Sequence, residues 1–485
     1  MSIEDDESGS PSKRTWLVHR GGALLAVLVL IAGVVVPPVA GLEPDMQLVL
    51  AVFLFTIVLW VTKPVPFTVS SVLAMSLLFA LGIAETFDEA VSGFASELVF
   101  FLFLLILLGN TIAKTGLDER AAHRMLSSTS TPRGSVRSLS TTVFGMSFFM
   151  PSAVARTVTF VPLVRRIAEA YELRERSNFE KASFFVLGHV NPIASMALMT
   201  GGGMAIITSE VIRTSVRSIT WVEWAIYMIP PVAVLYALSA ISATWLHPVN
   251  DDRTVGDADG GDRLSESAND HRERDPLSRD ERIVAWVMVG TVAAWIVGSF
   301  IGIPTILPAV VAVVVLSLPG IRLVTADDVR SMNWGILFVI GAMFSILEVM
   351  ETTGTLDFVI ENVTVVIPFE AMSLWQTVGV LLAVAIVMRT FFSTASAAIT
   401  VVLPVVIQFG AALVVDQLFL AFSILLIIGS TTFLPFNTTA VLISFDQGPL
   451  TARDVFTFGC VTMVYALIVI PVAWLFYWPL VETML

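Results

Sequence analysis

Long apolar runs occupy most of this 485-residue chain and restrict the folds that it can adopt. Hydrophobic residues make up 56% of the sequence, charged residues only 14%, and the mean hydropathy is +0.85. A soluble domain averages about 25% charged residues. Many runs reach or approach the ~18 apolar residues that cross a bilayer as a helix. Because backbone polar groups in lipid must be satisfied internally, we predict an all-α polytopic protein of the cell membrane with about eleven transmembrane helices.

A short pattern occurs twice within these apolar regions. Ser152 begins the first copy, which reads Ser-Ala-Val-Ala and reaches Pro162 ten positions later. Thr394 begins the second copy, which reads Thr-Ala-Ser-Ala and reaches Pro404 after the same interval. Small and hydroxylated residues at membrane depth are typical of re-entrant segments, whose freed backbone groups are buried in protein or line a cavity. Matching breaks in the two halves of a chain point to the binding site of a secondary transporter.

The two halves of the chain are related by an approximately constant offset. Two Thr-Gly sequences that end apolar runs, at Gly116 and Gly354, lie 238 residues apart, and the hydroxyl residues of the repeated pattern lie 242 apart. This agreement indicates one duplicated unit. Segment 117–139 carries four arginines, whereas segment 355–371 carries neither lysine nor arginine. The positive-inside rule therefore places the first hairpin on the cytoplasmic side and the second on the opposite side, as expected for inverted repeats.

The charge distribution predicts the domain organisation. The hydrophilic segment 247–282 contains eleven acidic residues and six arginines, and almost no apolar residues, so it cannot bury a core. We predict an N-terminus in the cytoplasm and a C-terminus outside. The expected parts are a cytoplasmic tail at 1–20, a first membrane half at 21–246 with its hairpin at about 140–164, an acidic cytoplasmic linker at 247–282, and a second membrane half at 283–485 with its hairpin at about 372–411.

Each half also contains an apolar run that is interrupted near its end. The first interruption is Thr-Gly-Gly-Gly at 200–203, and the second is Leu-Pro-Phe-Asn-Thr-Thr at 434–439. Half-helices that begin at such breaks expose backbone N–H groups, which bind anions together with nearby hydroxyl groups. Unwound carbonyl and hydroxyl oxygens suit sodium, and glycine lets the backbone approach closely. The alternative role of these small residues is helix–helix packing.

With these features together, the chain resembles the divalent-anion/sodium symporter family, within the wider citrate- and ion-transporter superfamily. The resemblance covers most of residues 50–480 and includes Gly-Phe-Ala-Ser-Glu at 93–97, Asn-Trp-Gly at 333–335, both hairpins and both breaks. It implies an elevator-type mechanism, a homodimer, and hairpin tips that read Ser-Asn-Thr and bind a carboxylate and sodium. The matching tips here lack the asparagine, and the first also lacks the threonine.

The resemblance and the breaks together select the candidate site residues. The predicted substrate-binding residues are Ser152, Ala153, Val154, Arg156, Thr394, Ala395, Ser396, Thr200, Gly201, Gly202, Pro435, Asn437, Thr438 and Thr439. Sodium, the one candidate coupling cofactor, is expected at Ser152, Gly202, Gly203, Thr394, Ser396 and Asn437.

Charged and titratable residues inside apolar runs form a separate group, because charges are costly in a membrane and usually functional. One hypothesis is that the guanidinium of Arg156 stands where a sodium ion sits in relatives, or binds the anion directly. The alternative is that it caps the hairpin, or reaches the interface or an acid such as Glu169. Arg389, just before the second tip, is a similar but weaker candidate. His189 and Glu348 are the candidate proton carriers, and a packing role is the alternative for His189.

These inferences predict secondary active transport of a small anion, such as a dicarboxylate, a tricarboxylate (citrate) or sulfate, coupled to Na⁺ or H⁺. The expected partners are the anion, the coupling ion, the lipid bilayer and a second copy of the chain, and no nucleic acid is expected. A metalloid-oxyanion efflux pump or a Na⁺/H⁺ antiporter of the same superfamily is the alternative within transporters. A membrane sensor that keeps the fold without transport is the alternative from another class.

Enzymatic activity is not expected. The sequence contains no H-E-x-x-H motif and no paired aspartates or serine–histidine constellation on neighbouring spans. It also lacks the G-x-x-x-x-G-K-[ST] phosphate loop that ATP-driven transport would require. The single cysteine, Cys460, excludes an intrachain disulfide and a cysteine metal cluster.

Overall fold

The structure is a computed structural model that describes residues 13–38, 41–117, 120, 131–150, 152–174, 176–249, 277–367 and 369–484. Within these ranges the regular elements are all helical. Eight of the described helices are long and apolar enough to cross a membrane by length and composition, and four further apolar helices are shorter. The prediction of an all-α polytopic protein is confirmed. Most of the predicted tail (1–12) and of the predicted linker (250–276) lies outside the described residues.

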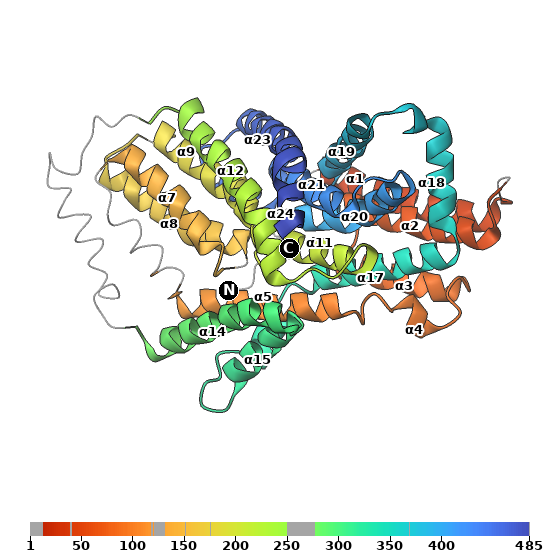
Figure 1. Ribbon diagram of the computed structural model, residues 1–485, viewed down its shortest axis with the longest axis horizontal. Coiled ribbons are helices and arrows are strands. Elements are labelled where there is room, and N and C mark those ends of the chain that lie inside the picture. The colour runs from red at the N-terminus through yellow and green to blue at the C-terminus, as the bar shows by residue number, and fades with distance from the viewer. Residues whose placement is uncertain are drawn as a thin grey trace. The chain divides into compact units, whose positions relative to one another are not determined.

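The chain forms two compact units, which are described separately. The first unit comprises residues up to 103, 327–381 and 400–416. Its complete helices are α1 (Lys13–Val35), α2 (Pro44–Thr62), α3 (Phe67–Ala80), α4 (Phe87–Ala90), α17 (Trp334–Thr352) and α18 (Thr355–Val366), with the 3₁₀ turn η3 (Phe369–Ala371). It also contains most of α16 (Ala326–Arg330), the start of α5 (Glu97–Thr115), the start of α19 (Leu374–Phe391) and the end of α20 (Ala395–Ala412). In this unit α17 packs against α2, α3 and α4 (Figure 1).

A close crossing in the first unit explains the Gly-Phe-Ala-Ser sequence at 93–96. A Cβ atom placed on Gly93 would lie 2.3 Å from the amide nitrogen of Ser345 and 2.4 Å from the carbonyl oxygen of Gly341. The Gly93 amide donates to the Ser345 hydroxyl at 3.1 Å. Any larger residue at position 93 would therefore push the loop away from α17. Next to this contact, the Ser92 hydroxyl donates to the Glu348 carboxylate at 2.5 Å.

The second unit contains both hairpin tips and both helix interruptions. In the first half its helices are α7 (Pro132–Met146), α8 (Ala153–Ala170), α9 (Asn178–Phe185), the π-helical turn η1 (Val186–Val190), α10 (Asn191–Ala194), α11 (Gly203–Ser215) and α12 (Trp221–Leu246). Those that follow are α14 (Arg279–Ile301), α15 (Ile306–Ser317), α21 (Gln417–Ser430), the 3₁₀ turn η4 (Pro435–Asn437), α22 (Thr439–Gln447), α23 (Ala452–Val472), the π-helical turn η5 (Ala473–Tyr477) and α24 (Trp478–Met484). Figure 1 shows α7 and α8 as two adjacent arms of a hairpin.

The first interrupted helix differs from the expected one in its position. The sequence predicts a break at 200–203. In the structure, regular helix continues through η1 and α10 but already ends at Ala194, and α11 begins at Gly203. The second break agrees more closely, because α21 ends at Ser430 and α22 begins at Thr439. Each half therefore contains one hairpin and one interrupted helix, as the inverted repeat requires.

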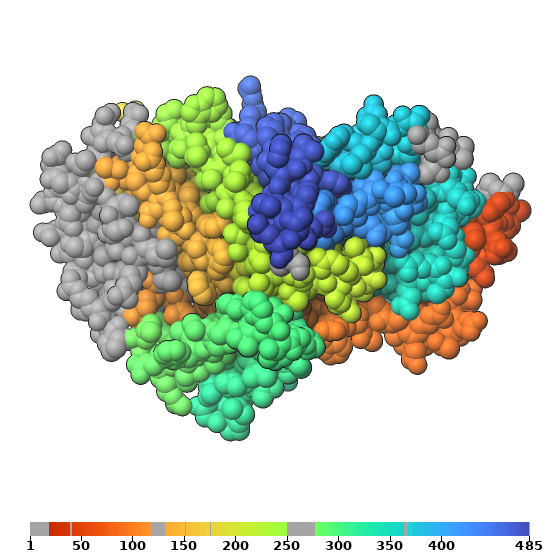
Figure 2. Space-filling model, in the orientation of Figure 1, coloured from red at the N-terminus to blue at the C-terminus, as the bar shows by residue number. Residues whose placement is uncertain are grey.

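The core of the second unit lies around α21, whose residues from Leu418 to Ser430 are all buried. Trp224 of α12 packs its ring edge-on against Phe422 of α21, with ring centroids 5.4 Å apart. The C-terminal helices α23 and α24, dark blue in Figure 2, lie beside α12, yellow-green in the same view. The outer faces of these helices and of the turn η5 between them carry exposed apolar side chains, including Phe476 of η5 at 71% exposure. Such a surface fits a helix that faces lipid, because water would not favour so large an apolar area.

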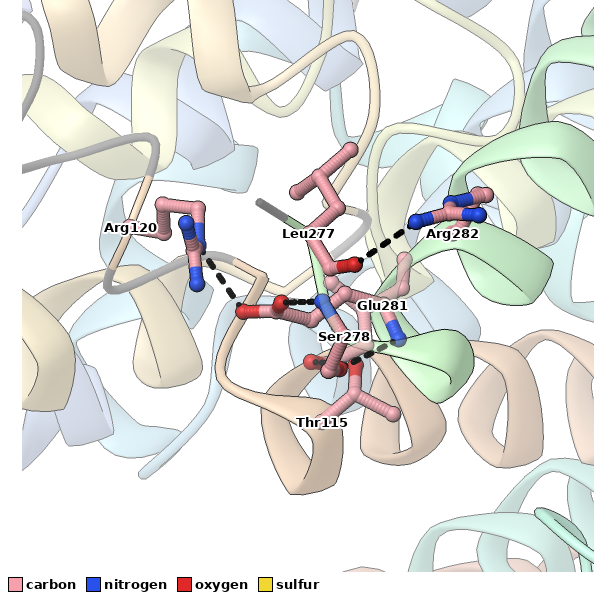
Figure 3. A network of polar contacts seen from close by, with 7 residues as sticks. Thr115, Arg120, Leu277, Ser278, Glu281 and Arg282 are labelled. Atoms are coloured by element: carbon pink, nitrogen blue, oxygen red, sulfur yellow. Dashed lines mark hydrogen bonds and ion pairs between the residues drawn. The ribbon is translucent and has the colours of Figure 1, made fainter. Parts of the chain in front are cut away.

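Polar contacts join α5 to α14 at the start of the second half (Figure 3). Arg120, which follows α5, forms an ion pair with Glu281 of α14 at 3.0 Å. Glu281 also accepts a hydrogen bond from the Ser278 amide at 2.7 Å, and its own amide donates to the Ser278 hydroxyl at 3.1 Å. This reciprocal capping box fixes the first turn of α14. Nearby, the Lys114 ammonium donates to the carbonyl of Leu323 at 3.3 Å.

Candidate functional site

The first hairpin tip is the start of helix α8. Ser152 adopts an extended backbone conformation, and its hydroxyl oxygen accepts a hydrogen bond from the Ala155 amide at 3.2 Å. Ser152 is thus the N-cap of α8, and Ala153 and Val154 form the first turn. A hydroxyl that accepts in this way keeps its proton and can donate to another group. The tip therefore presents donors together with the positive end of a helix dipole.

The second hairpin tip has the same local geometry. The Thr394 hydroxyl accepts a hydrogen bond from the Ala397 amide at 3.1 Å, directly before α20. Ala395 and Ser396 occupy the first turn of that helix. The repeated hydroxyl-Ala-x-Ala pattern is therefore a repeated helix cap, since a short hydroxyl residue at the N-cap satisfies an amide that the helix leaves unpaired.

The first helix break depends on glycine and on two tryptophans. A Cβ atom on Gly201 would lie 2.5 Å from the carbonyl oxygen of Ser195, and one on Gly202 would lie 3.1 Å from the Ser195 Cβ. The break thus folds back on itself with no room for a side chain at Gly201. Trp221 of α12 donates from Nε1 to the Thr200 hydroxyl at 3.1 Å, and Trp224 donates to the carbonyl of Met196 at 3.3 Å. These donors satisfy polar groups that the interrupted helix cannot.

The second helix break, between Ser430 and Thr439, contains Pro435, which opens the 3₁₀ turn η4. The Asn437 side chain accepts from the Leu434 amide at 2.9 Å and closes this turn. Thr438 then caps α22, because its hydroxyl accepts from the Val441 amide at 3.1 Å. Thr439 is the first residue of α22 and is exposed. Two helix N-termini, those of α11 and α22, therefore begin at the breaks, and two more, those of α8 and α20, begin at the tips.

Arg156 joins the first tip to the first break. Its side chain is completely buried. Nε donates to the Asn191 side-chain oxygen at 2.7 Å and Nη2 donates to the Ser195 hydroxyl at 2.6 Å, both beside the break. Nη1 donates to the carbonyl of Met150, on the other side of the tip. Asn191 in turn donates to the carbonyl of Ala153 at 2.7 Å. The tip and the break are thus held together by reciprocal hydrogen bonds.

Arg389 joins the second tip to the second break in a comparable way. Its side chain is also completely buried. Nη1 donates to the carbonyl of Phe392 at 2.9 Å, Nη2 to the carbonyl of Asn437 at 2.7 Å, and Nε to the carbonyl of Ile428 at 3.2 Å. The Asn437 side chain donates back to the carbonyls of Thr390 and Phe392, at 3.2 and 3.0 Å. Each half therefore pairs one arginine on the hairpin with one asparagine at the break.

The two guanidinium groups make the local charge positive. Their described hydrogen bonds all end on carbonyl, amide or hydroxyl oxygens, and none ends on a carboxylate. A buried charge is costly unless neighbouring groups solvate it, and the carbonyl dipoles at the tips do so here. Two positive charges without a carboxylate among their described hydrogen-bond partners, together with four helix N-termini, favour an anion.

Contacts between the two halves bring their breaks together within the second unit. Met196 of the first break lies against Gly429 of α21, where a Cβ atom would be only 2.4 Å from its sulfur. Helix α22 packs against α8 and η1, and Gly188 of η1 faces Ser444 of α22. The two hairpin tips and the two breaks are thus parts of one packed body.

The structure places the predicted residues in different surroundings. The tip and break residues lie in the second unit, at four helix starts, whereas Glu348 lies in the first unit and contacts Ser92. His189 is buried in η1. Two residues that contact Arg156, Asn191 and Ser195, were not predicted. An asparagine followed by proline inside an apolar run was the available signal for Asn191, because a proline in a helix leaves a backbone carbonyl of the preceding turn without its usual donor.

Comparison with known proteins agrees with this architecture. Residues 18–484 match the family described as "Sodium:sulfate symporter transmembrane region". A protein named "Membrane protein" from Cupriavidus necator is 24% identical over 405 residues, covering 80% of this chain and 78% of its own. The L-tartrate/succinate antiporters of Escherichia coli O157:H7 and Escherichia coli strain K12 are each 24% identical over 512 residues, covering 97% of this chain and 99% of theirs. The chain belongs to the sodium:sulfate symporter family of membrane transporters.

Proposed function

We propose that this protein exchanges small dicarboxylate-class anions across the membrane without needing sodium. The observation that carries the proposal is the buried arginine that links hairpin to break in each half, Arg156 in the first and Arg389 in the second. A fixed positive charge at each tip would always be present to stabilise a bound anion, whereas a cation does so only while it is bound.

The donors at the tips and breaks suit a carboxylate. Ser152 and Thr394 each accept from their own helix and keep a proton to donate. The first turns of α8, α11, α20 and α22 add backbone N–H groups that have no partner within the helix. An anion with two negatively charged ends would match the two tips, one for each carboxylate.

The surroundings of the tips suit a sodium ion less well. Sodium needs several oxygen ligands, and the carbonyls of Met150 and Phe392 at the tips already accept hydrogen bonds from the arginines. At the second tip the Phe392 carbonyl also accepts from Asn437. A cation there would compete with a guanidinium for the same oxygens and would be repelled by its charge.

The relatives support exchange as the mode of transport, because the antiporters that match over 97% of this chain are named for L-tartrate and succinate. Hydrogen bonds between each tip and its break would make the two hairpins and the two interrupted helices move together. This is the property that an elevator-type movement requires, and we expect the protein to work as a homodimer.

Transport by purified protein in liposomes tests the proposal. Labelled succinate, tartrate, citrate and sulfate would be offered to vesicles loaded with unlabelled succinate or with none, each with a Na⁺ gradient, a H⁺ gradient or neither. The expected result is uptake that requires succinate inside and does not change when Na⁺ is replaced by choline. Uptake into vesicles without internal anion that rises with a Na⁺ gradient would instead identify a sodium-coupled symporter with ligands at Ser152, Thr394 and Ser396.

A further inference from the structure

His189 is a buried polar group for which the proposed anion site has no role. Its side chain is 4% exposed, and neither ring nitrogen forms a hydrogen bond of good geometry within the described part of the chain, although the backbones of Thr432 and Val455 lie near the ring. Leaving a buried polar group unpaired costs about 1–3 kcal/mol. The residue also lies in η1, and π-helical turns inserted in helices are frequent at functional sites. Both observations suggest that the ring has a partner at another stage of the protein's activity.

The ring lies where the two halves meet. The centroids of the Phe185 and Phe458 rings are 5.6 and 5.2 Å from the imidazole centroid. The backbones of Thr432, in the second break, and Val455, on α23, also face the ring. A neutral imidazole has one N–H donor and one acceptor, whereas a protonated imidazole has two donors. Backbone carbonyls accept only, so the neutral ring can donate to one of these two neighbours, and an added proton would supply the donor for the second.

Charged groups lie close to His247, a second histidine that contacts Phe185. Lys181 of α9 and Asp454 of α23 form an ion pair at 3.6 Å. Both interact with His247, which stacks on Phe185 with ring centroids 5.2 Å apart. Within the described residues, none of the ion pairs includes His189. A proton on His189 would therefore be held by backbone carbonyls and not by a carboxylate.

We propose that His189 binds a proton during the transport cycle, in a conformation in which the protonated ring donates to backbone carbonyls at the second break. The ligand of this site is a proton that comes from water and returns to water, so only the N–H bond forms and breaks. Because His189 belongs to the first half and Thr432 to the second, the proton would join the two halves. This inference rests on the proposed transport function and adds a pH dependence to it.

The pH profile of exchange tests the inference. Succinate exchange would be measured from about pH 5 to pH 8, the range in which histidines titrate, for wild type, His189→Gln and the matched control His247→Gln. Glutamine keeps a polar side chain of similar length but cannot bind a proton. The expected result is a wild-type rate that changes by up to about tenfold per pH unit over part of this range, a flat profile for His189→Gln, and a wild-type profile for His247→Gln. A His189→Gln protein with the wild-type profile would overturn the inference, and so would a flat wild-type profile.

A second measurement separates this inference from the transport function and does not need an active variant. Nitrogen NMR of protein labelled with ¹⁵N-histidine would report the protonation state of each imidazole, with and without succinate. The His189 signal is the one missing from His189→Gln, or from His189→Asn if the glutamine variant does not fold. A shift of that signal with pH in the presence of succinate supports the inference. A His189 signal that stays neutral throughout would overturn it, whereas absence of wild-type exchange would contradict the proposed function alone.

Discussion

Replacing Arg156 with methionine removes the charge that we propose acts in place of a cation. Methionine keeps much of the apolar volume of the side chain, so the main losses are the positive charge and the hydrogen bonds that join the tip to the break. Two of these bonds, to the Asn191 side chain at 2.7 Å and to the Ser195 hydroxyl at 2.6 Å, connect the hairpin to the interrupted helix.

The expected effect follows from the strength of these bonds. A hydrogen bond from a charged donor contributes about 1.5–3 kcal/mol. If the anion-binding arrangement loses one such bond, the apparent KM should rise about tenfold to 150-fold, because roughly 1.4 kcal/mol corresponds to a factor of ten. Thermal stability should fall by less than the free energy of the lost hydrogen bonds, because the substitution also removes a buried charge that has no carboxylate partner among its described contacts.

The assay is succinate exchange in proteoliposomes with and without Na⁺. Arg156→Lys keeps the charge but not the planar fork of donors, so it should keep Na⁺ independence and lose affinity. Arg166→Met, at an exposed position on the same helix, is the matched control and should behave like wild type. An Arg156→Met protein with wild-type KM and an unchanged response to Na⁺ would show that the guanidinium neither replaces a cation nor organises the site.

Three further substitutions test other parts of the structure. Gly459→Ala should lower the melting temperature by several degrees, because a Cβ atom there would lie 1.9 Å from the carbonyl oxygen of Thr432. Gly290→Ala is the control and should leave the melting temperature unchanged, because no atom lies within 4 Å of its Cβ position. Equal melting temperatures for the two variants would contradict the close packing at Gly459. Burial lowers the pKa of His247 below its usual value, Lys181 lowers this pKa further, and Asp454 opposes the shift. The folded protein should therefore lose stability as the pH falls below about 6.5. Thermal unfolding at different pH values should show a smaller loss for His247→Gln. Glu281→Gln removes the charge that pairs with Arg120 at 3.0 Å and should lower the free energy of unfolding in denaturant by roughly 1–3 kcal/mol. If the pair is responsible, replacing Glu281 and Arg120 together should cost less than the sum of the two single substitutions.

Local chemistry explains why much of the site could be predicted from sequence. Ser152 and Thr394 cap the helices that follow them, and capping depends on residues only three positions apart. Pro435 and Asn437 form the 3₁₀ turn between α21 and α22 by their own geometry and hydrogen bonding. Patterns of this range are readable because the interacting groups are neighbours in the chain.

Contacts between distant residues explain what the sequence could not show. The first interrupted helix ends at Ala194, six residues before the Thr-Gly-Gly-Gly sequence, although no glycine or proline directly follows Ala194. The carbonyl of Met196 is satisfied there by Trp224, and the Met196 side chain lies against Gly429, which comes from the other half. Likewise Asn191 meets Arg156 across 35 positions. Tertiary packing of this kind overrides local preference and has no signature in a single sequence.

The placement of the two buried arginines has a consequence for the history of the chain. The tips are 242 positions apart, so duplication would pair Arg156 with Ala398 and Arg389 with Ser147. Neither partner is an arginine, and the arginines lie on opposite arms of their hairpins, one after its tip and one before it. A duplicated unit with a single arginine therefore does not account for both charges, and the two halves have changed at these positions, by gain or by loss, since they began to diverge. The two halves reached similar tip-to-break links by separate changes, so a relative can carry either arginine without the other.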